Sequence, residues 1–526
     1  MTPSISSVAW YSIPAPLLWP LLPAVCMLAA GIWLALLHRY TTATWFLAAF
    51  ALLAGVFAAS LDPYLNLWDE QFHALVARNL ALDPFKPMLY TETPYQVRPG
   101  MWTHGTIWLH KQPLFLWQMA LFIKVLGPSV WAVRLPSVLL FSLMPLMVFS
   151  MGRFFANARV GWIAALLSST SFFVYELISG RFATDHNDVV FLVYTTASLW
   201  AFTRYLKKPA WQNAVLVGVL AGAAVMVKWL PGLLVFAGWG AWLLAGRHRV
   251  VARLWWHVAL AFAVSVVLVV PWQVYTLMAF PTEARFELEY NSRHFNEVIE
   301  GHGGGWFFHF KALEDLYGSG DAMIAVVLAA IVLFPLLVRR TEVVAPLAWV
   351  VVPYVVFTLA ATKMKAFCLP AAPVVWMSLA VVIDRLLSLV PDTNRRWLKG
   401  PKLLGGLAVW LTVAFLMFNL NEMARVRFLP DSPELAARLK QQQLLTAIDA
   451  MKQAWAGNNR VLVFTNFRLQ APGLSFYAGC NVYGYVPSKT QVEQFLSDGK
   501  QVWFINGGTL PDYLAQNQEV KVVNVE

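Results

Sequence analysis

Residues 68–80 read WDEQFHALVARNL and open a polar stretch that runs from Leu67 to Pro113, where it ends in WLHKQP. This stretch lies between long apolar segments. Asp69 and Glu70 stand side by side just after the first of these segments, where an ionised side chain is costly unless it is paired or has a function. The two carboxylates therefore predict either a catalytic site or a cap on a helix that begins there, since acidic groups favour the first turn of a helix.

The same stretch gathers acidic, basic and aromatic side chains, which are the ingredients of a site for a sugar and a phosphate. The basic and aromatic residues are His73, Arg78, Lys86, Arg98, His104, His110, Lys111, Trp68, Trp102, Trp108, Tyr90 and Tyr95. These neighbouring residues favour the catalytic interpretation of Asp69 and Glu70 over the helix cap.

The composition predicts a membrane protein that crosses the bilayer many times. The chain has 526 residues, is 59% hydrophobic, contains 25 Trp and has a mean hydropathy of +0.58, which is too apolar for a soluble protein. Its net charge of +11 does not indicate a nucleic-acid partner, because the basic residues fall in short clusters between apolar runs, as in membrane loops. Cys26, Cys368 and Cys480 are far apart and indicate no disulfide framework or metal motif. The N-terminal residues lack the basic region of a cleavable signal, so we expect the first helix to remain as a span.

About twelve apolar runs are long enough, or nearly long enough, to cross a bilayer. They lie at about 15–37, 43–60, 131–152, 160–178, 189–205, 212–228, 231–246, 255–276, 321–338, 343–360, 367–390 and 402–421. Every second connection between them is basic and is therefore expected on the cytoplasmic side. Both termini and the other connections are then outside: 61–130, 180–188, the turn at Lys228, 281–320 and 362–365. The apolar residues 114–127 would break this alternation as a span, so we expect a helix along the interface.

The composition changes after the last apolar run, which predicts two domains. Residues 1–421 form the membrane domain. Residues 422–526 are polar and contain a helical segment and four strand-like runs, RVLVFT, NVYGY, QVWFIN and VKVVNV, separated by turn residues. We expect a small α/β domain on the outer face.

Further polar groups lie in the expected outer connections. The turn GRFATDHND places Arg181, Asp185 and Asp188 at the mouth of two helices, either as a solvated helix cap or as part of a site. Lys228 ends a helix and is either a snorkelling lysine or a phosphate contact. Lys363 and Lys365 run against the charge rule for an outer connection, and a bound anion would explain them.

The long outer loop carries histidines that leave two alternatives open. His294, Glu300, His302 and His309 surround three glycines and indicate either a divalent metal site or the lining of a substrate cleft. Their spacing is not that of a zinc motif, so the sequence requires no cofactor.

The cations of the outer face share one depth in the membrane. Lys111, Lys228, Lys363, Lys365 and Arg181 all lie near the expected headgroup level, opposite Asp69 and Asp185. A phosphate on a lipid carrier fits that depth, because lysines can meet its charge there.

The order of motifs resembles the bacterial branch of the protein O-mannosyltransferase family, which includes the aminoarabinose transferase of lipid A. After the Asp-Glu pair come ALVARNL, KQPLF, GPSVWAVRLPSVL, ATDHNDVVFL, EGHGGGWFFHF and TKMKAFCLPAAP, over most of residues 60–380. The resemblance implies a C-type (GT-C) membrane glycosyltransferase fold with an outer catalytic cavity. It also implies a polyprenyl-monophosphate sugar donor and a place in the bacterial inner membrane.

Carried over residue by residue, the resemblance implies roles for several residues. Asp69 matches the catalytic aspartate and Glu70 its partner. Lys111 matches the lysine of the Lys-Pro-Pro motif near the donor phosphate, and Lys363 matches the lysine before the Tyr-x-x-Pro type ending. The second acidic residue is Asp185, or else Asp188.

Three positions depart from the family pattern. The chain has Lys111-Gln112-Pro113 where the family has Lys-Pro-Pro. Phe367 replaces the usual tyrosine, and His73 stands where tyrosine or another polar aromatic is common. These departures bear on the identity of donor or acceptor and leave the reaction class in place.

The resulting hypothesis is an inverting transfer of a sugar to an acceptor hydroxyl or phosphate of a lipid, a glycan or a secreted protein. Asp69 acts as the base, and Lys111, Lys363, Lys365, Arg181 and Lys228 hold the donor phosphate. His73, Asp188 and His302 line the substrate cavity. The alternatives are a transporter or flippase of lipid-linked sugars, and a ligase or polymerase that uses diphosphate-linked donors.

Overall fold

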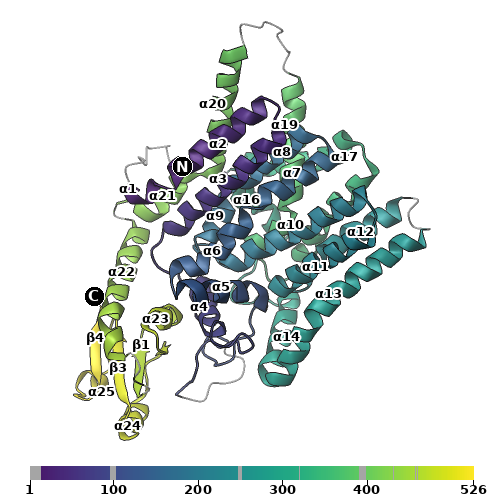
Figure 1. Cartoon of the computed structure of the whole chain (residues 1–526). Helices are drawn as coiled ribbons and strands as arrows, with labels where there is room; N and C mark the ends of the chain where they lie inside the picture. Colours follow the sequence, from purple (N-terminus) through teal and green to yellow (C-terminus); the bar gives the residue numbers. More distant parts are fainter. Residues whose placement is uncertain are drawn as a thin grey trace.

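The computed structural model describes residues 13–94, 102–246, 251–318, 320–389, 399–430, 432–455, 458 and 460–525. Figure 1 shows a bundle of long helices with a small domain of helices and strands at one end. Arg98 and Tyr95, which belong to the first expected outer loop, lie outside the described residues.

The helices of the bundle confirm a multi-pass membrane protein. Ten helices in the described part of the chain are long and apolar enough to cross a membrane, and a further pair, bent by 44°, makes an eleventh if it is counted as one span. The bent pair is α8 (Ala158–Ser169) with α9 (Phe172–Ile178). The ten are α1 (Ala15–Leu18) with α2 (Leu21–Leu36), α3 (Tyr40–Ser60), α6 (Val130–Phe141) with α7 (Met144–Phe155), α10 (Asp185–Lys207), α11 (Trp211–Lys228), α13 (Ala252–Ala279), α17 (Asp321–Val338), η4 (Thr341–Val343) with α18 (Val344–Leu359), η5 (Lys365–Ala371) with α19 (Ala372–Ser388), and α20 (Lys399–Phe418) with α21 (Leu420–Phe428).

The expected span at 231–246 differs from the structure. The backbone turns at Trp229, which has a φ of 55°, and the 3-10 turn η2 (Leu230–Leu233) precedes α12 (Leu234–Ala245). Twelve α-helical residues rise about 18 Å, well below the roughly 30 Å of a hydrocarbon core. The apolar run is therefore a shorter helix and does not meet the length of a span.

Shorter helices gather at the end of the bundle where the expected outer connections lie. They are α4 (Asp69–Leu80), α5 (Pro113–Leu126), α14 (Pro281–Asn296), α15 (Phe308–Lys311) and α16 (Leu313–Tyr317). The charges of α4 stabilise the helix. Asp69 and Glu70 occupy its first turn and Arg78 its last, where each charge interacts favourably with the helix dipole. Helix α5 starts on Pro113 and stops before Gly127, whose φ is 80°.

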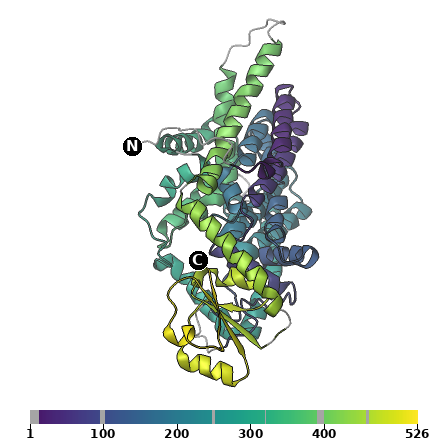
Figure 2. The same ribbon diagram turned by 90° about the vertical axis from the view of Figure 1, so that its left-hand side faces the viewer.

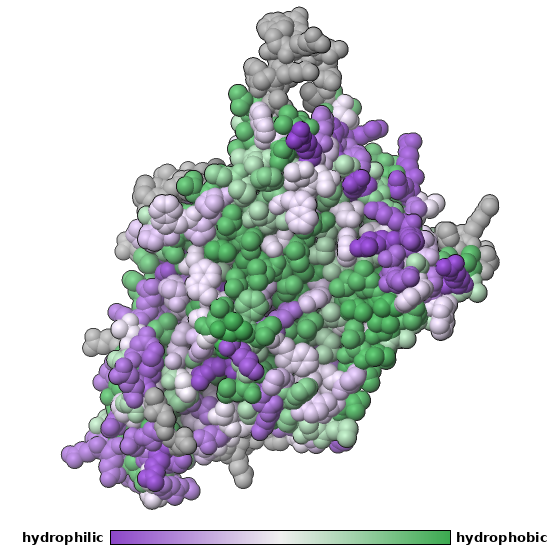
Figure 3. Space-filling view, viewed as in Figure 1, coloured by the Kyte–Doolittle hydropathy of each residue, from purple (hydrophilic) through white to green (hydrophobic). Residues whose placement is uncertain are grey.

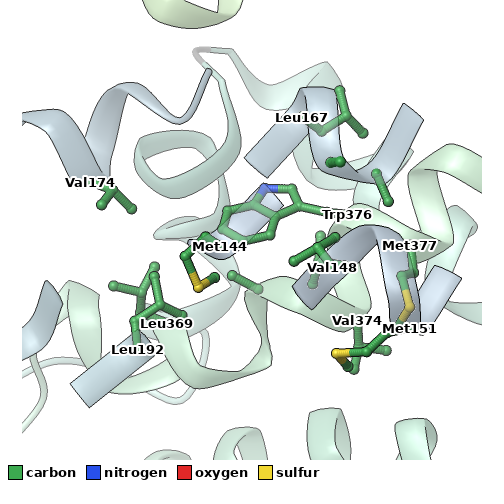
Figure 4. Close-up of a cluster of buried hydrophobic side chains, with 14 of the residues drawn as sticks. Met144, Val148, Met151, Leu167, Val174, Leu192, Leu369, Val374, Trp376 and Met377 are labelled. Atoms are coloured by element: carbon green, nitrogen blue, oxygen red, sulfur yellow. The ribbon is translucent and has the colours of Figure 1, made fainter. Parts of the chain in front are cut away.

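The membrane bundle is held by close packing. In Figure 4 the ring of Trp376 lies at the centre of a buried cluster that includes Met144, Val148 and Leu167. Helices α7 and α8 approach closely, since a Cβ added to Gly152 would lie 2.7 Å from the Cα of Gly161. Such small residues let helices pack where lipid supplies little hydrophobic driving force.

The C-terminal domain contains the four strands expected from the sequence. The strands β1 (Val461–Thr465), β2 (Val482–Tyr483), β3 (Gln501–Asn506) and β4 (Lys521–Asn524) form a parallel sheet in the order β2-β1-β3-β4. The helices of the domain are α22 (Pro433–Trp455), η7 (Arg468–Gln470), α23 (Ala471–Ala478), α24 (Lys489–Ser497) and α25 (Asp512–Ala515). Figure 2 shows this domain below the bundle.

The surface separates apolar from polar regions. Figure 3 shows hydrophobic residues across the middle of this face, with hydrophilic residues at the upper right and over the C-terminal domain at the lower left. An apolar band between two polar ends is the expected surface of a bundle that spans a bilayer.

Candidate active site

Asp69 is the first residue of α4 and is buried. The residue is 8% exposed, and its Oδ2 accepts a 2.7 Å hydrogen bond from the backbone N–H of Thr184. Burial raises the pKa of this carboxyl, but Lys111, His73 and the Thr184 N–H outweigh it and hold the pKa below its ordinary value. Asp69 is therefore ionised at neutral pH and can accept a proton.

Glu70 is fully buried, and both of its carboxylate oxygens are bonded to protein. Arg134 of α6 donates to Oε1 at 2.6 Å and to Oε2 at 2.9 Å, and the backbone N–H of Asn66 donates to Oε2 at 2.5 Å. His186 Nε2 lies 3.2 Å from Oε1. A Cβ on Gly180 would lie 2.1 Å from the Cδ of Glu70, so the α9–α10 turn closes over the carboxylate. These contacts fix the start of α4 against the membrane helices.

His73 and Asp185 form a second buried pair beside Asp69. His73 Nδ1 lies 2.9 Å from Asp185 Oδ1, and both side chains are 0% exposed. His73 stands four residues after Asp69 on α4, so the two share one face of the helix. In the described part of the chain, neither His73 Nε2 nor Asp185 Oδ2 has a hydrogen-bond partner. These two buried polar atoms are therefore available to a bound molecule or water.

Asp188 has a different environment from Asp185. Its carboxylate forms an ion pair with Lys228 and accepts a hydrogen bond from the hydroxyl of Thr184. The Lys228 ammonium also lies 5.2 Å from the centre of the Phe367 ring. The charge of Lys228 is thus met by Asp188, and the structure separates the two aspartates that the sequence left as alternatives.

Lys111, in the first outer loop, acts on the carboxylate of Asp69 through its charge. No hydrogen bond or ion pair within the described ranges involves its ammonium, although its charge lowers the pKa of Asp69 and of His110. Next to it, the His110 ring stacks on Trp102 with the ring centroids 4.2 Å apart, and His110 Nδ1 lies 3.3 Å from Glu287 Oε2. A free cation beside an ionised carboxylate, with stacked aromatic rings close by, is suited to a phosphate and a sugar.

A cavity of about 790 Å³ lies next to Asp69 and the residues around it. Its lining includes four of the residues expected at the site, Arg181, His302, Lys363 and Lys365, together with Thr184. Asp69, Lys111, Lys228 and Asp185 do not line it. Thr184 connects the two groups, because its N–H holds Asp69 while the residue itself faces the cavity.

The cations of the cavity already have protein partners. Arg181 Nε donates to Glu176 Oε2 at 2.7 Å, and Lys365 Nζ lies 2.9 Å from Asp315 Oδ2. Lys363 Nζ donates to the carbonyls of Phe357, Thr358 and Ala360 at the end of α18, at 3.3, 2.7 and 2.5 Å. A ligand phosphate would therefore share these cations with existing partners, whereas Lys111 has no partner among the residues that the structure describes.

The histidines of the long outer loop do not form a cluster. His294 Nδ1 bonds the carbonyl of Tyr290, His309 Nε2 bonds the carbonyl of Phe357, and Glu300 accepts from the Tyr290 hydroxyl. Over the residues that the structure describes, no three His, Cys, Asp or Glu side chains come together as a metal site. Of this set, His302 lines the cavity.

Arg134, Glu176, Thr184 and Glu287 also belong to this region and were not predicted from the sequence. Arg134 and Glu176 had a signal, since each is an ionisable residue within an expected apolar run, where such residues are rare and functional. Thr184 acts through its backbone N–H, which no residue type reveals. Glu287 had no signal, because α14 carries several other acidic residues.

Comparisons with known proteins agree with this fold. A family model described as dolichyl-phosphate-mannose-protein mannosyltransferase matches residues 110–275. No curated protein sequence matches the chain.

Solved structures resemble nearly the whole chain. ArnT from Cupriavidus metallidurans bound to undecaprenyl phosphate has a TM-score of 0.58 at 15% identity, over 91% of this chain and 89% of that one. AglB, the oligosaccharyltransferase from Archaeoglobus fulgidus in complex with an inhibitory peptide and a dolichol-phosphate, has a TM-score of 0.53 at 12% identity, over 83% of this chain and 63% of that one. The GT-C fold expected from the motifs is confirmed by these likenesses.

Proposed function

We propose, from the fold that this chain shares with GT-C membrane glycosyltransferases, that it is an inverting glycosyltransferase with a polyprenyl-monophosphate sugar donor. The observation that carries the proposal is an ionised, buried carboxylate, Asp69, under the electrostatic influence of Lys111, a cation with no ion-pair partner among the described residues. Both lie beside a cavity of about 790 Å³. Such a pair provides a base for the acceptor and a counter-charge for the leaving group.

The reaction follows from these two groups. Asp69 takes the proton of the acceptor hydroxyl as that oxygen forms a bond to the anomeric carbon. The bond from the anomeric carbon to the donor phosphate breaks on the opposite face, and the polyprenyl phosphate leaves with one more negative charge than it had in the donor. Lys111 stabilises that charge, so the leaving group requires no proton. An acceptor phosphate would attack without needing the base.

The other residues have supporting roles in this proposal. Arg181, Lys363 and Lys365 line the cavity and add positive potential for the phosphate, while Lys228 holds Asp188 in place. His73 and Asp185 contact the substrate beside Asp69, and His302 lines the cavity. Glu70 positions α4, because its oxygens are already bonded to Arg134 and Asn66.

A lipid carrier also fits the surroundings of the cavity. An apolar groove of about 430 Å³ runs between α15–α16 and the spans α17 and α18, lined by Trp306, Phe310, Leu313, Ile331 and Val351 among others. Phe308 and Tyr317 of the same two short helices line the cavity itself. An isoprenoid tail in the groove would place its phosphate near the cavity. The ligands of ArnT and AglB, undecaprenyl phosphate and dolichol-phosphate, support this class of donor.

Sidedness follows from the charge pattern. Arg153, Arg159, Arg339 and Arg340 lie at the opposite ends of the spans from Asp69, and basic connections favour the cytoplasm. We therefore place the site and the C-terminal domain, residues 422–526, on the periplasmic face of a bacterial inner membrane, with residues 1–421 as the membrane domain. The acceptor is then a lipid such as lipid A, a glycan or a secreted protein.

The donor class is tested with the full chain in lipid nanodiscs. Labelled polyprenyl-monophosphate sugars and the matching diphosphate-linked sugars are offered with an acceptor extract from a strain that lacks the gene. We expect transfer from a monophosphate donor alone. Transfer from the diphosphate donors, or from none of the monophosphates, contradicts the proposal. Mass spectrometry of lipid A, glycans and glycoproteins from strains with and without the gene identifies the acceptor.

A further inference from the structure

The helix that carries Asp69 is packed against the C-terminal domain. Helix α23 of that domain lies against α4, although about 400 residues separate the two in sequence. Leu65 and Leu75 share one buried cluster with Phe464 and Phe476 of the domain. Figure 1 shows α23 at the side of the domain that faces the bundle. The domain is thus continuous with the core beneath α4.

Hydrogen bonds from the domain hold the start of α4. The backbone N–H of Leu65 donates to the Tyr477 hydroxyl at 2.8 Å. Gln71, which is 0% exposed, accepts from the backbone N–H of Gly473 at 3.2 Å and donates to the carbonyl of Leu65 at 3.2 Å. Gln71 follows Asp69 by two residues, so these bonds fix the turn in which the carboxylate stands.

A second contact holds the other end of α4. Arg78 Nη1 donates to the carbonyls of Ser475 and Phe476 at 2.8 and 3.1 Å. These carbonyls lie in the last turn of α23, where the helix dipole is negative, and that of Ser475 also accepts the backbone N–H of Gly479 at 3.3 Å. The guanidinium therefore caps α23 and joins the two helices.

The connection to the domain holds the residues before α4. Arg427 of α21 donates to Asp62 Oδ2 at 3.0 Å and to both oxygens of Glu176 at 2.9 and 2.8 Å. Arg438 of α22 donates to Asp62 Oδ1 at 2.6 Å and to the carbonyl of Leu61 at 2.8 Å. Asp62 is 2% exposed. Breaking one partner of such a buried network leaves a charge without compensation.

We propose that the C-terminal region positions Asp69 for the transfer, with Gln71, Arg78, Arg427 and Arg438 as positioning residues. The inference rests on the proposed function of Asp69. Glu422 and Val426 of α21 line the cavity, but no described residue of the sheet or of α22–α25 does. The sheet and α22–α25 therefore act on the carboxylate through α4 and not by contact with the substrate there. A shift of about 1 Å at a reacting group can cost about a hundredfold in rate, so the attachment of α4 is sufficient to control kcat.

The contact can be broken at one glycine. A Cβ added to Gly473 would lie 2.6 Å from the Cδ of Gln71, so a larger side chain cannot fit while Gln71 keeps its bonds. In the Gly473→Leu variant we expect faster hydrogen exchange in residues 61–80 and a fall of kcat of about tenfold or more, with the donor KM within about twofold. The matched control is Ala515→Leu, which adds the same side chain at an exposed position of the same domain.

Two further variants distinguish a loss of positioning from misfolding of the domain. Arg78→Ala removes the contacts to Ser475 and Phe476 without changing the domain. Combining Gln71→Ala with Gly473→Leu removes the clash, so we expect the double variant to lose less activity than the product of the two single losses. A purely structural defect of the domain would not be relieved by a substitution in α4.

Each result bears on the proposal. Faster exchange in residues 61–80 together with a lower kcat supports it. Unchanged exchange, unchanged kcat despite faster exchange, or strictly multiplicative losses in the double variant overturn it. If the wild-type chain transfers no sugar, the proposed function fails, and the exchange experiment alone then decides whether the domain holds α4.

Discussion

The backbone N–H of Thr184 donates a 2.7 Å hydrogen bond to Oδ2 of Asp69, and Thr184 also lines the cavity. Thr184 has a φ of 67°, so the turn before α10 directs its N–H at the carboxylate. In the described part of the chain no protein group bonds Oδ1 of Asp69. This oxygen is therefore the one that is free to take a proton.

Replacing this carboxylate tests its role as the base. Asp69→Asn keeps the size of the side chain and an oxygen for the Thr184 N–H but cannot accept a proton. We expect kcat to fall by about 10²–10⁴-fold while donor binding stays within about twofold, since general bases contribute factors of that size. The measurement is single-turnover transfer together with donor binding in nanodiscs. Near-normal turnover would show that Asp69 is not the base.

Lys111 is predicted to hold the donor phosphate. Lys111→Gln removes a cation that has no partner in the described structure, and a charged hydrogen bond to phosphate is worth about 1.5–3 kcal/mol. We expect donor affinity to fall about tenfold or more. Lys86→Gln removes an exposed cation from the same loop and serves as the control. Equal affinities for the two variants would contradict the assignment.

The two aspartates of α10 are predicted to fail in different ways. Asp185→Asn weakens the hold on His73 beside Asp69, so we expect kcat to fall by at least about tenfold, since the aspartate fixes the orientation and tautomer of the histidine. Asp188→Asn leaves Lys228 without its counter-charge, so we expect the melting temperature to fall more than kcat does. Steady-state rates and thermal unfolding of both variants distinguish the two residues. A larger loss of kcat in Asp188→Asn would reverse the assignment.

Glu70 is predicted to stabilise the fold. Glu70→Gln leaves Arg134 buried without its carboxylate, which costs about 3–5 kcal/mol for a buried pair. Asp449→Asn breaks an exposed pair, 48% and 64% exposed, and should cost less than about 1 kcal/mol. Thermal unfolding in detergent compares the two. Similar melting temperatures for both variants would mean that the Glu70–Arg134 pair does not hold α4.

The sequence predicted the parts of the fold that hydropathy controls. Most of the long apolar runs are helices long enough to span a membrane. The alternation of basic connections assigned the loops that contain Asp69, Thr184, His110 and Glu287 to one side. These loops meet in the structure, where Thr184 bonds Asp69 and His110 lies against Glu287. Periodicity also found all four strands of the C-terminal domain. Two expected spans differ. Residues 231–246 follow a local turn at Trp229 that hydropathy does not detect, and residues 160–178 bend by 44° between α8 and α9.

Pairing between distant residues could not be read from the sequence. Lys228, Lys365 and Arg181 looked like free cations, but Asp188, Asp315 and Glu176 partner them in the fold. The contact between Gly473 and Gln71 joins residues 402 positions apart, and only the close approach of two helices creates it. Residue type indicates which groups carry charge, whereas partners depend on tertiary packing.

The pair of Glu287 and His110 gives a pH-dependent prediction. Burial raises the pKa of Glu287 to about 7 from an ordinary 4.5, although Lys111 and His294 oppose it. Between these two values the native chain holds a proton that the unfolded chain releases, so this group makes stability fall as pH rises from 4.5 to 7.

His110 acts in the opposite direction. Burial and Lys111 hold its pKa well below the ordinary 6.5, so the unfolded chain binds a proton below pH 6.5 that the native chain does not bind, and stability rises with pH up to that value. The two slopes partly cancel in the wild type. In Glu287→Gln the contribution of Glu287 is lost and that of His110 remains, because burial and Lys111, the largest causes that lower the pKa of His110, are unchanged.

We therefore expect the melting temperature of Glu287→Gln to rise between pH 5 and pH 7 more steeply than that of the wild type. Glu297→Gln, which changes an exposed carboxylate of the adjoining segment, serves as the control and should keep the wild-type profile. The measurement is intrinsic-fluorescence melting in nanodiscs at half-unit steps of pH. If Glu287→Gln and the wild type rise in parallel, Glu287 does not titrate in this interval and is not held against His110 by burial.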